Sequence, residues 1–276
     1  MRVTSLLAWG TALLAGSPSA ALDAQLLLGC VLGRDRSWVL AHDDYRAAST
    51  ESAAFRLLIE RRWCGEPVAY IRGVVQWYGM ALEVTPDVLI PRPETELMVE
   101  QAVRMAHNYS ALRIADIGTG CGAIAIALAR ALPHCRIVAT DRTASILGVA
   151  ACNAERMAVD ERISLRCGDL LSPVLARPDL LVANLPYLSA TMMASLPRDV
   201  RHEPMGALYG GESGWELYER LVDQLCERAW EIPFIFEIDP CQAEHLRSSV
   251  RARLPVGRLD VLQDYAGYDR FVVYEP

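Results

Sequence analysis

The sequence contains no lysine, so each of its 27 basic residues is an arginine. Because this bias applies at every basic position, it reflects composition and does not indicate a particular site. The arginines are outnumbered by 34 acidic residues, which gives a net charge of -7 and an isoelectric point near 5.3. A chain with this balance lacks the overall positive field that holds proteins on DNA or RNA.

Long apolar runs are also absent, since no segment has the roughly twenty uninterrupted apolar residues of a membrane-spanning helix. The eight cysteines are scattered and include no CxxC pair. Most of them lie in apolar runs, where buried free thiols are common, and we therefore expect free thiols in a reducing cytoplasm. The histidines lack the spacing of metal ligands, so no metal is expected.

At 276 residues and 52% hydrophobic composition, the chain is long enough to form an ordinary globular protein. Its first twenty residues have one arginine, an apolar middle and a Ser-Pro-Ser-Ala end, which resembles a secretory signal peptide. The alternative is a structural helix, with Thr4 as a candidate N-cap and leucines at roughly helical spacing. We favour the helix.

The pattern changes twice along the chain. Residues 1–66 have helical spacing, with one helix in 21–33 and another that stops at Gly65. Residues 67–90 are rich in branched and aromatic residues and predict a linking β-hairpin. A rigid Pro91–Pro93 turn then precedes a helix that should run from near Thr95 to about His107.

Short apolar runs alternate with helical segments in residues 91–276, and most of the runs end in aspartate or asparagine. This alternation predicts an α/β fold with a doubly wound, mostly parallel sheet, and the last two strands form an antiparallel hairpin. A helix is expected over 212–230. In such a sheet, ligands bind at the carboxyl ends of the strands, so the polar residues there are the candidate site.

The first candidate is the loop Asp116-Ile117-Gly118-Thr119-Gly120-Cys121-Gly122, which lies between an apolar strand and a helix. Its glycines allow sharp turns and close approach of a ligand. A dinucleotide loop would have the spacing G-x-G-x-x-G and would hold a pyrophosphate. A loop that has an acidic residue and no phosphate-binding group instead suits S-adenosylmethionine, because this ligand carries a positively charged sulfonium and an ammonium group. A capping carboxylate is the alternative for Asp116.

The next strand ends supply further polar groups. Asp141 is placed to accept hydrogen bonds from both hydroxyls of a ribose. Asp169 is a candidate acceptor for an adenine amino group, with Leu170 packed on the ring, although a turn aspartate is equally consistent. Asn184 opens the segment Asn184-Leu185-Pro186-Tyr187 at the same edge. Four strand ends around one nucleoside-like ligand are a fairly specific signal.

The sequence resembles the HemK/PrmC protein methyltransferases over nearly its whole length. The resemblance lies in RRWCGEPVAYIRG and LIPRPETE before the catalytic region, and in DIGTGCGAIAIALA, ATDRTASIL, GDLL, NLPY, EPMGALYGGESG and DYAGYDRFV within it. It implies a class I, Rossmann-like, seven-stranded methyltransferase domain with a small N-terminal helical domain that recognises the substrate. Because the helical segment matches from near residue 1, the resemblance also argues against a cleaved signal peptide.

This family methylates the side-chain nitrogen (N5) of the glutamine in the Gly-Gly-Gln motif of peptide-chain release factors, with S-adenosylmethionine as donor. By resemblance, Asn184, Pro186 and Tyr187 would be the catalytic residues, and Asn184 to Tyr187 would hold the amide. The cofactor site would comprise Asp116, Gly118, Thr119, Gly120, Cys121, Gly122, Asp141, Asp169, Leu170 and Asn184. We expect a cytoplasmic monomer that binds neither membranes nor nucleic acid directly.

Two residues depart from the family pattern. Leu185 stands where the family usually has proline, and Asp239 stands where it usually has glycine. Leu185 should contribute mainly its backbone carbonyl, so we expect little loss of activity. Asp239 puts the local loop geometry in question. Arg92 and Glu94 could either line the cofactor site or make a hinge rigid.

Three other functions compete with this one. A nucleic-acid methyltransferase acting on adenine N6 or on guanine N2 of RNA could use the same Asn-x-Pro-Tyr segment on a flipped base. The acidic charge and the lack of a basic domain count against it. Glycine spacing disfavours a nicotinamide-dependent oxidoreductase, and a silent binding module would leave the Asn-Leu-Pro-Tyr segment without a function.

Overall fold

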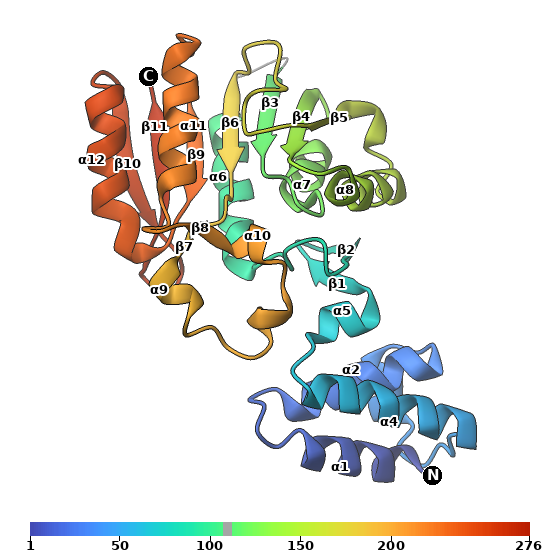
Figure 1. Ribbon diagram of the computed structural model, residues 1–276. Coiled ribbons are helices and arrows are strands. Elements are labelled where there is room, and N and C mark those ends of the chain that lie inside the picture. The colour runs from blue at the N-terminus through green and yellow to red at the C-terminus, as the bar shows by residue number, and fades with distance from the viewer. Residues whose placement is uncertain (107–111) are drawn as a thin grey trace. The chain divides into compact units, whose positions relative to one another are not determined.

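A computed structural model describes residues 1–106 and 112–276 (Figure 1). The chain divides into two compact units. The first comprises residues Met1–Val74 together with Pro197–His202, and the second comprises Val75–Leu196 and Glu203–Pro276. Within the described residues, no helix is long and apolar enough to span a membrane.

The first unit is built from helices around a small apolar core. They are α1 (Val3–Leu13), α2 (Ala20–Leu32), α3 (Arg36–Ala41), α4 (Ser49–Trp63) and α5 (Val68–Arg72). Leu6, Leu27, Phe55 and Ile59 are completely buried in this core. Gly10 allows close approach, since a Cβ atom there would lie 2.9 Å from the Phe55 ring. The expected helices over 21–33 and up to Gly65 are therefore confirmed.

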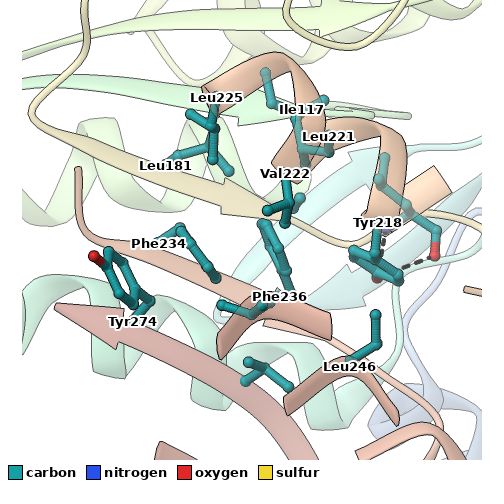
Figure 2. Packing of buried hydrophobic residues seen from close by; sticks show 14 of the residues in the cluster. Ile117, Leu181, Tyr218, Leu221, Val222, Leu225, Phe234, Phe236, Leu246 and Tyr274 are labelled. Atoms are coloured by element: carbon teal, nitrogen blue, oxygen red, sulfur yellow. Dashed lines mark hydrogen bonds between the residues drawn. The ribbon is translucent and has the colours of Figure 1, made fainter. Parts of the chain in front are cut away.

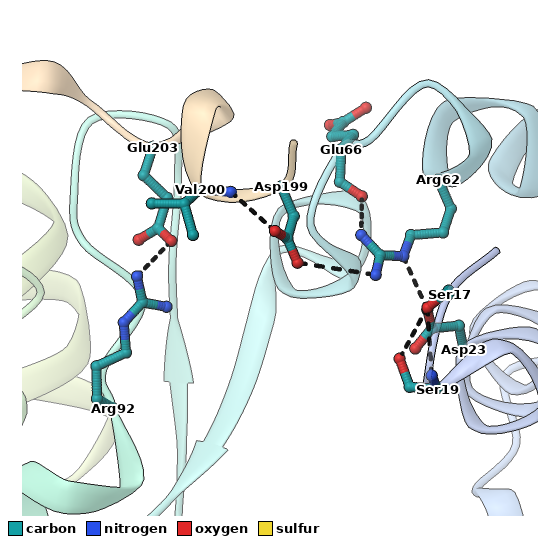
Figure 3. Close-up of polar contacts among 9 residues, drawn as sticks. All are labelled: Ser17, Ser19, Asp23, Arg62, Glu66, Arg92, Asp199, Val200 and Glu203. Carbon is teal, nitrogen blue, oxygen red and sulfur yellow. Dashed lines mark hydrogen bonds and ion pairs between the residues drawn. The ribbon is translucent and has the colours of Figure 1, made fainter. Parts of the chain in front are cut away.

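A buried ion pair joins two helices of this unit. The Arg62 guanidinium donates to the Asp23 carboxylate at 2.8 Å, and both side chains are almost fully buried. The same guanidinium lies 3.9 Å from the Asp199 carboxylate (Figure 3). Arg198 donates to the Cys64 carbonyl at 3.4 Å. These contacts anchor Pro197–His202 to the helices.

Several expectations for this region were wrong. Arg2, and not Thr4, is the N-cap of α1, and the Thr4 hydroxyl instead donates to the Asp43 carbonyl at 2.5 Å. The stretch Val68–Arg72 is helical, so the hairpin is shorter than predicted. Of the eight cysteines, which all lie within the described ranges and are all free, only Cys121 and Cys135 are buried.

The β-hairpin consists of strands β1 (Val74–Trp77) and β2 (Met80–Glu83) and, apart from Val74, belongs to the second unit. Tyr78 and Gly79 form its two-residue turn with φ values of 47° and 68°, as a tight hairpin turn requires. The indole of Trp77 donates to the Arg92 carbonyl at 2.7 Å, which ties the hairpin to the Pro91–Pro93 turn.

The described part of the second unit contains a seven-stranded sheet in the order β10-β11-β9-β6-β3-β4-β5. These strands are β3 (Leu112–Ile117), β4 (Cys135–Asp141), β5 (Ile163–Cys167), β6 (Leu180–Ala183), β9 (Phe234–Glu237), β10 (Arg258–Gln263) and β11 (Asp269–Glu275). Parallel pairing connects the neighbouring strands β5, β4, β3, β6 and β9. β11 pairs antiparallel with β9 on one side and with β10 on the other. The predicted parallel sheet with a final hairpin is confirmed.

The main helices fall into two groups, as a doubly wound fold requires. The bounds are α6 (Glu96–Ala106), α7 (Ala123–Ala131), α8 (Ala144–Arg156), α11 (Glu216–Glu227) and α12 (Ala243–Arg253). Helix α7 contacts α6 and α8, while α11 contacts α12. The predicted end of the helix near His107 lies outside the described residues. Helices α11 and α12 bury Leu221, Leu225 and Leu246 against strand residues such as Phe234 and Phe236 (Figure 2).

Short elements follow β6: β7 (Leu188–Ser189), α9 (Ala190–Met193), α10 (Met205–Leu208) and β8 (Tyr209–Gly211). β7 and β8 pair with each other, so residues 209–211 form a strand, and α11 begins at Glu216 instead of 212. The helix α12 was not predicted. Asp239 has an extended backbone with φ -75° and caps the following short turn, so aspartate fits there without strain.

Candidate active site

A cavity of about 190 Å³ lies at the carboxyl ends of β3, β4, β5 and β6. Of the predicted site residues, those that line it are Gly118, Thr119, Gly120, Cys121, Asp141, Asp169, Leu170, Asn184, Leu185 and Pro186. Asp116, Gly122 and Tyr187 are not among the lining residues. The sheet therefore gathers most of the predicted residues at one edge, and their individual roles stay predictions.

The loop after β3 takes its shape from its glycines. Gly118, Gly120 and Gly122 have φ values of 78°, 55° and 85°, a region that favours glycine. The Gly118 and Thr119 N–H groups both donate to the Thr140 carbonyl at 2.9 Å, which fixes the loop to β4. A Cβ atom at Gly118 would also lie 2.9 Å from the Leu185 side chain. The loop thus combines a left-handed backbone with close packing.

Asp116 lies behind this loop and is completely buried. The Thr119 hydroxyl donates to its Oδ2 at 2.7 Å, whereas Oδ1 has no hydrogen-bond partner in the described part of the chain. Burial raises the pKa of the Asp116 carboxyl to about 7, although the Thr119 hydrogen bond opposes this shift. The site therefore contains a buried carboxylate with an unused acceptor atom.

Asp141 ends β4 at the cavity wall. Its Oδ2 accepts the Gly120 N–H at 3.0 Å, and its Oδ1 accepts the Arg142 N–H at 2.8 Å. Burial raises the pKa of this carboxyl, and the two backbone hydrogen bonds counteract that shift. Because each oxygen keeps a free lone pair, the carboxylate can accept two further hydroxyl hydrogens.

Asp169 and Leu170 line the cavity after β5. The Asp169 carboxylate forms an ion pair with Arg220 at 2.6 Å, and its side chain is 56% exposed. Leu170 is buried and has a φ of 49°, and its carbonyl accepts the Thr140 hydroxyl at 3.1 Å. Sequence reasoning did not predict the Arg220 partner, which occupies one of the carboxylate oxygens.

The Asn184-Leu185-Pro186-Tyr187 segment leaves β6 in a firmly held conformation. The Asn184 side-chain nitrogen donates to the Thr95 hydroxyl at 3.2 Å. The Leu185 N–H donates to the buried Tyr218 hydroxyl at 3.1 Å, and that hydroxyl donates in turn to the Glu237 carbonyl. These contacts connect the segment to helices and to the neighbouring strand.

Tyr187 is held by contacts outside the cavity lining. Its ring packs against the apolar cluster beneath α11 and α12, and its carbonyl accepts the Gln242 side-chain N–H at 2.7 Å. Burial raises the pKa of its phenol well above the ordinary value. The predicted contact of this ring with a planar amide stays a prediction.

Arg92 has a structural partner. Its guanidinium donates to the Glu203 carboxylate at 2.5 Å (Figure 3). The Ile90 N–H donates to the other Glu203 oxygen at 3.1 Å. The Glu203 side chain is only 2% exposed. Arg92 and Glu94 are not among the cavity-lining residues, although Pro91 and Thr95 are. The contacts thus favour the rigid-segment alternative for Arg92.

Sequence reasoning missed Thr95 and Glu237. Thr95 follows the Pro91–Pro93 turn and is 3% exposed, and Glu237 ends β9 and is 1% exposed. The rule that selected Asn184, a polar residue at the end of an apolar strand, also applies to Glu237. No comparable signal marked Thr95.

Comparison with known proteins agrees with this architecture. Residues 5–73 match the PrmC N-terminal domain, and residues 94–196 match the methyltransferase small domain. Among solved structures, the hMettl16 catalytic domain in complex with a MAT2A 3'UTR hairpin has a TM-score of 0.60 at 16% identity. That match covers 71% of this chain and 75% of that one. At this identity the likeness shows the fold alone, which is that of a class I methyltransferase.

Curated relatives are closer in sequence, and many of them carry the name release factor glutamine methyltransferase. The Bordetella pertussis protein is 41% identical, covering 73% of this chain and 74% of the relative. The Moorella thermoacetica protein is 37% identical over 92% and 90%, and the Deinococcus radiodurans protein is 34% identical over 99% and 98%. Because the last two matches span nearly the whole length of both chains, this chain belongs to the release factor glutamine methyltransferase family.

Proposed function

We propose that this protein methylates the side-chain amide nitrogen (N5) of the glutamine in the Gly-Gly-Gln motif of peptide-chain release factors, with S-adenosylmethionine as donor. The observation that carries the proposal is the orientation of Asn184 at the cavity. Its nitrogen is held by Thr95, so its oxygen stays available to accept a hydrogen bond from a substrate N–H. A cytoplasmic monomer that does not bind nucleic acid directly is part of the same proposal.

The residues around the cavity fit this cofactor. Apolar side chains such as Leu89, Ile124 and Ile146 line it together with the carboxylate of Asp141. Asp141 would accept from the ribose hydroxyls, and Leu170 would pack on the adenine. The unpartnered Oδ1 of Asp116 adds negative charge behind the loop, which suits a cationic ligand and not a phosphate.

A glutamine amide is a poor nucleophile because its nitrogen lone pair is delocalised into the carbonyl. When bound, the cofactor supplies a methyl group activated by a sulfonium. The task of the protein is therefore to orient the amide. The Asn184 Oδ1 and the carbonyl of Leu185 or Pro186 would accept hydrogen bonds from the two N–H groups of the substrate amide. These two bonds would aim the lone pair of the amide nitrogen at the methyl group. Orientation of this kind lowers barriers by roughly 7–11 kcal/mol in the best cases.

The test is to incubate the protein with radiolabelled S-adenosylmethionine and, in parallel, a release factor, its Gly-Gly-Asn variant, DNA and RNA. We expect label only in the release factor with the intact Gly-Gly-Gln motif. Label confined to nucleic acid would overturn the proposal.

Replacing Asn184 with alanine tests the role of the amide. The variant should lose at least about a hundredfold in kcat, because misplacing a reacting group by about 1 Å already costs that much. Its affinity for S-adenosylhomocysteine, measured by calorimetry, should change far less. The matched control is Gln101→Ala on α6, which removes a half-buried amide whose oxygen accepts hydrogen bonds from Arg104. Normal turnover of the Asn184 variant would refute the role.

A further inference from the structure

Glu237 lies directly beside the Asn184 segment. It ends β9, which pairs in parallel with β6, and Asn184 follows the last residue of β6. Its side chain is almost completely buried, and Oε2 has no hydrogen-bond partner among the described residues. A buried carboxylate oxygen without a partner is costly, and such groups tend to occur at functional sites.

Thr95 links Glu237 to Asn184. The Thr95 hydroxyl lies beside the Glu237 carboxyl and lowers its pKa by hydrogen bonding, and the Thr95 oxygen accepts the Asn184 side-chain N–H at 3.2 Å. Thr95 is 3% exposed, so bulk water does not compete for these contacts. The three side chains therefore form one continuous hydrogen-bonded chain that ends at the cavity.

The direction of this chain follows from proton counting. A threonine hydroxyl has one hydrogen, and a carboxylate can only accept. When Thr95 donates to Glu237, its oxygen can only accept from Asn184. The amide nitrogen of Asn184 must then face Thr95, which leaves the amide oxygen as the group available to a substrate N–H in the cavity.

We propose that Glu237 is a positioning residue for methyl transfer, acting through Thr95 to keep the Asn184 side-chain oxygen directed at the substrate. The inference rests on the proposed function of the site. An asparagine amide has nearly the same shape in its two orientations, so its hydrogen-bond partners decide between them. The flipped amide would present its NH₂ group to the NH₂ group of the substrate, which leaves both donors unsatisfied.

The charge on Glu237 determines whether Thr95 holds the Asn184 amide in this orientation. Burial raises the pKa of its carboxyl to about 7, so its protonation state changes near neutral pH. Protonated Glu237 could itself donate to Thr95, which would free the threonine hydrogen to bond the Asn184 oxygen. The charged or titratable groups that face Glu237 are Arg92, Glu94, Tyr187, Tyr218 and Arg270. The arginines favour the charged form, and Glu94 opposes it.

The kinetic test compares Thr95→Val, Thr95→Ser, Glu237→Gln and the Thr95→Val/Glu237→Gln double variant. Valine keeps the shape of threonine without its hydroxyl, so we expect kcat at pH 8 to fall at least about tenfold. Serine restores the hydroxyl and should recover most of the activity. Glu237→Gln should also lower kcat, and the KM for the release factor and the affinity for S-adenosylhomocysteine should stay within about twofold in all variants.

The combined effect of the two substitutions on kcat distinguishes a positioning role of Glu237 from a merely structural one. If Glu237 acts only through Thr95, adding Glu237→Gln to Thr95→Val should lower kcat no further. The carboxyls of Asp116 and Glu237 both have a pKa of about 7, so kcat of the wild type should rise with pH through this value, and Glu237→Gln should remove the contribution of Glu237 to this rise. Additive losses of kcat, or losses that track a lower Tm, would overturn the proposal.

A second measurement does not depend on the methylated substrate. The side-chain amide signals of Asn184 are assigned by ¹⁵N NMR through their loss in Asn184→Ala. These signals should shift in Thr95→Val and Glu237→Gln, and they should titrate near pH 7 in the wild type only. Unchanged signals would refute the hydrogen-bonded chain even if the release factor is methylated. A shift without methylation of the release factor would support the chain and refute the proposed function.

Discussion

Replacing Asp116 with asparagine is expected to stabilise the second unit of the unliganded protein much more at pH 8 than at pH 5. The wild-type carboxylate is completely buried, and one of its oxygens has no partner in the described part of the structure. Burial raises the pKa of this carboxyl from 3.8 to about 7. Asparagine keeps the shape of the side chain and cannot ionise, so the variant removes the pH-dependent penalty.

The direction in which stability changes with pH follows from proton binding. Because the pKa is higher in the folded state than in the unfolded state, the folded protein binds more protons between the two values. The contribution of Asp116 to stability is therefore greatest below pH 3.8 and is lost as the pH rises through about 7. Integrated over this shift, the penalty is about 2 kcal/mol at pH 5 and about 4 kcal/mol at pH 8. The difference between wild type and variant should grow by about 2–3 kcal/mol over this range.

The measurement is urea-induced unfolding of both proteins at pH 5 and pH 8. Asparagine also introduces an amide that needs its own partners, which costs about 1–3 kcal/mol, but this cost does not vary with pH. Asp160→Asn, at an exposed position, is the matched control for the loss of one carboxylate. An equal stability difference at both pH values would refute the assignment of a raised pKa to Asp116.

Three further predictions concern neighbouring contacts. Asp141→Ala should weaken binding of S-adenosylhomocysteine at least about tenfold, through loss of charged hydrogen bonds, and unchanged affinity in calorimetry would remove it from the site. Tyr218→Phe should lower the free energy of unfolding by about 1–3 kcal/mol because it leaves buried backbone groups without a partner; an unchanged urea midpoint would contradict this. Arg92→Ala should cost about 3 kcal/mol because it leaves buried Glu203 without its cation, whereas exposed Arg104→Ala should be nearly neutral in thermal unfolding.

The sheet could be predicted because its strands carry a strong local signal. The parallel strands are continuous apolar runs bounded by glycine, aspartate or asparagine, as in Leu180–Ala183, where every residue is buried. Helix Ala243–Arg253 was missed because only Ala243, Leu246 and Val250 are buried in a largely polar segment. Three apolar residues at helical spacing are too weak a pattern without the neighbouring α11.

Local propensity also failed at Val68–Arg72. Valine, tyrosine and isoleucine favour strands, yet Pro67 precedes this segment and Gly73 follows it with a φ of 69°. Proline before the first turn and glycine after the last are helix boundaries. In this short segment the boundary residues outweighed the propensities of the residues between them.

Residues of the candidate site could be predicted only at the carboxyl ends of the parallel strands, where a polar residue is expected to contact the ligand. The ends of parallel strands meet at one edge, so Asp141 and Asn184 could be placed without knowing their contacts. Thr95 lies 89 residues before Asn184, and no periodicity relates the two positions. Their hydrogen bond arises because the Pro91–Pro93 turn returns to the sheet edge, which is a property of the fold.

Leu185 shows how the protein can keep the Asn184 segment rigid without the proline that the family usually has at this position. Proline restricts its own backbone but has no N–H to donate. Leucine retains the N–H, which donates to Tyr218, and its side chain is 3% exposed and packs where a Cβ atom at Gly118 would clash. The hydrogen of Tyr218 goes to the Glu237 carbonyl, so the hydroxyl oxygen can accept from Leu185 while the strand end is held in place. Packing and one buried hydrogen bond thus restrict the backbone at Leu185, as a proline ring would.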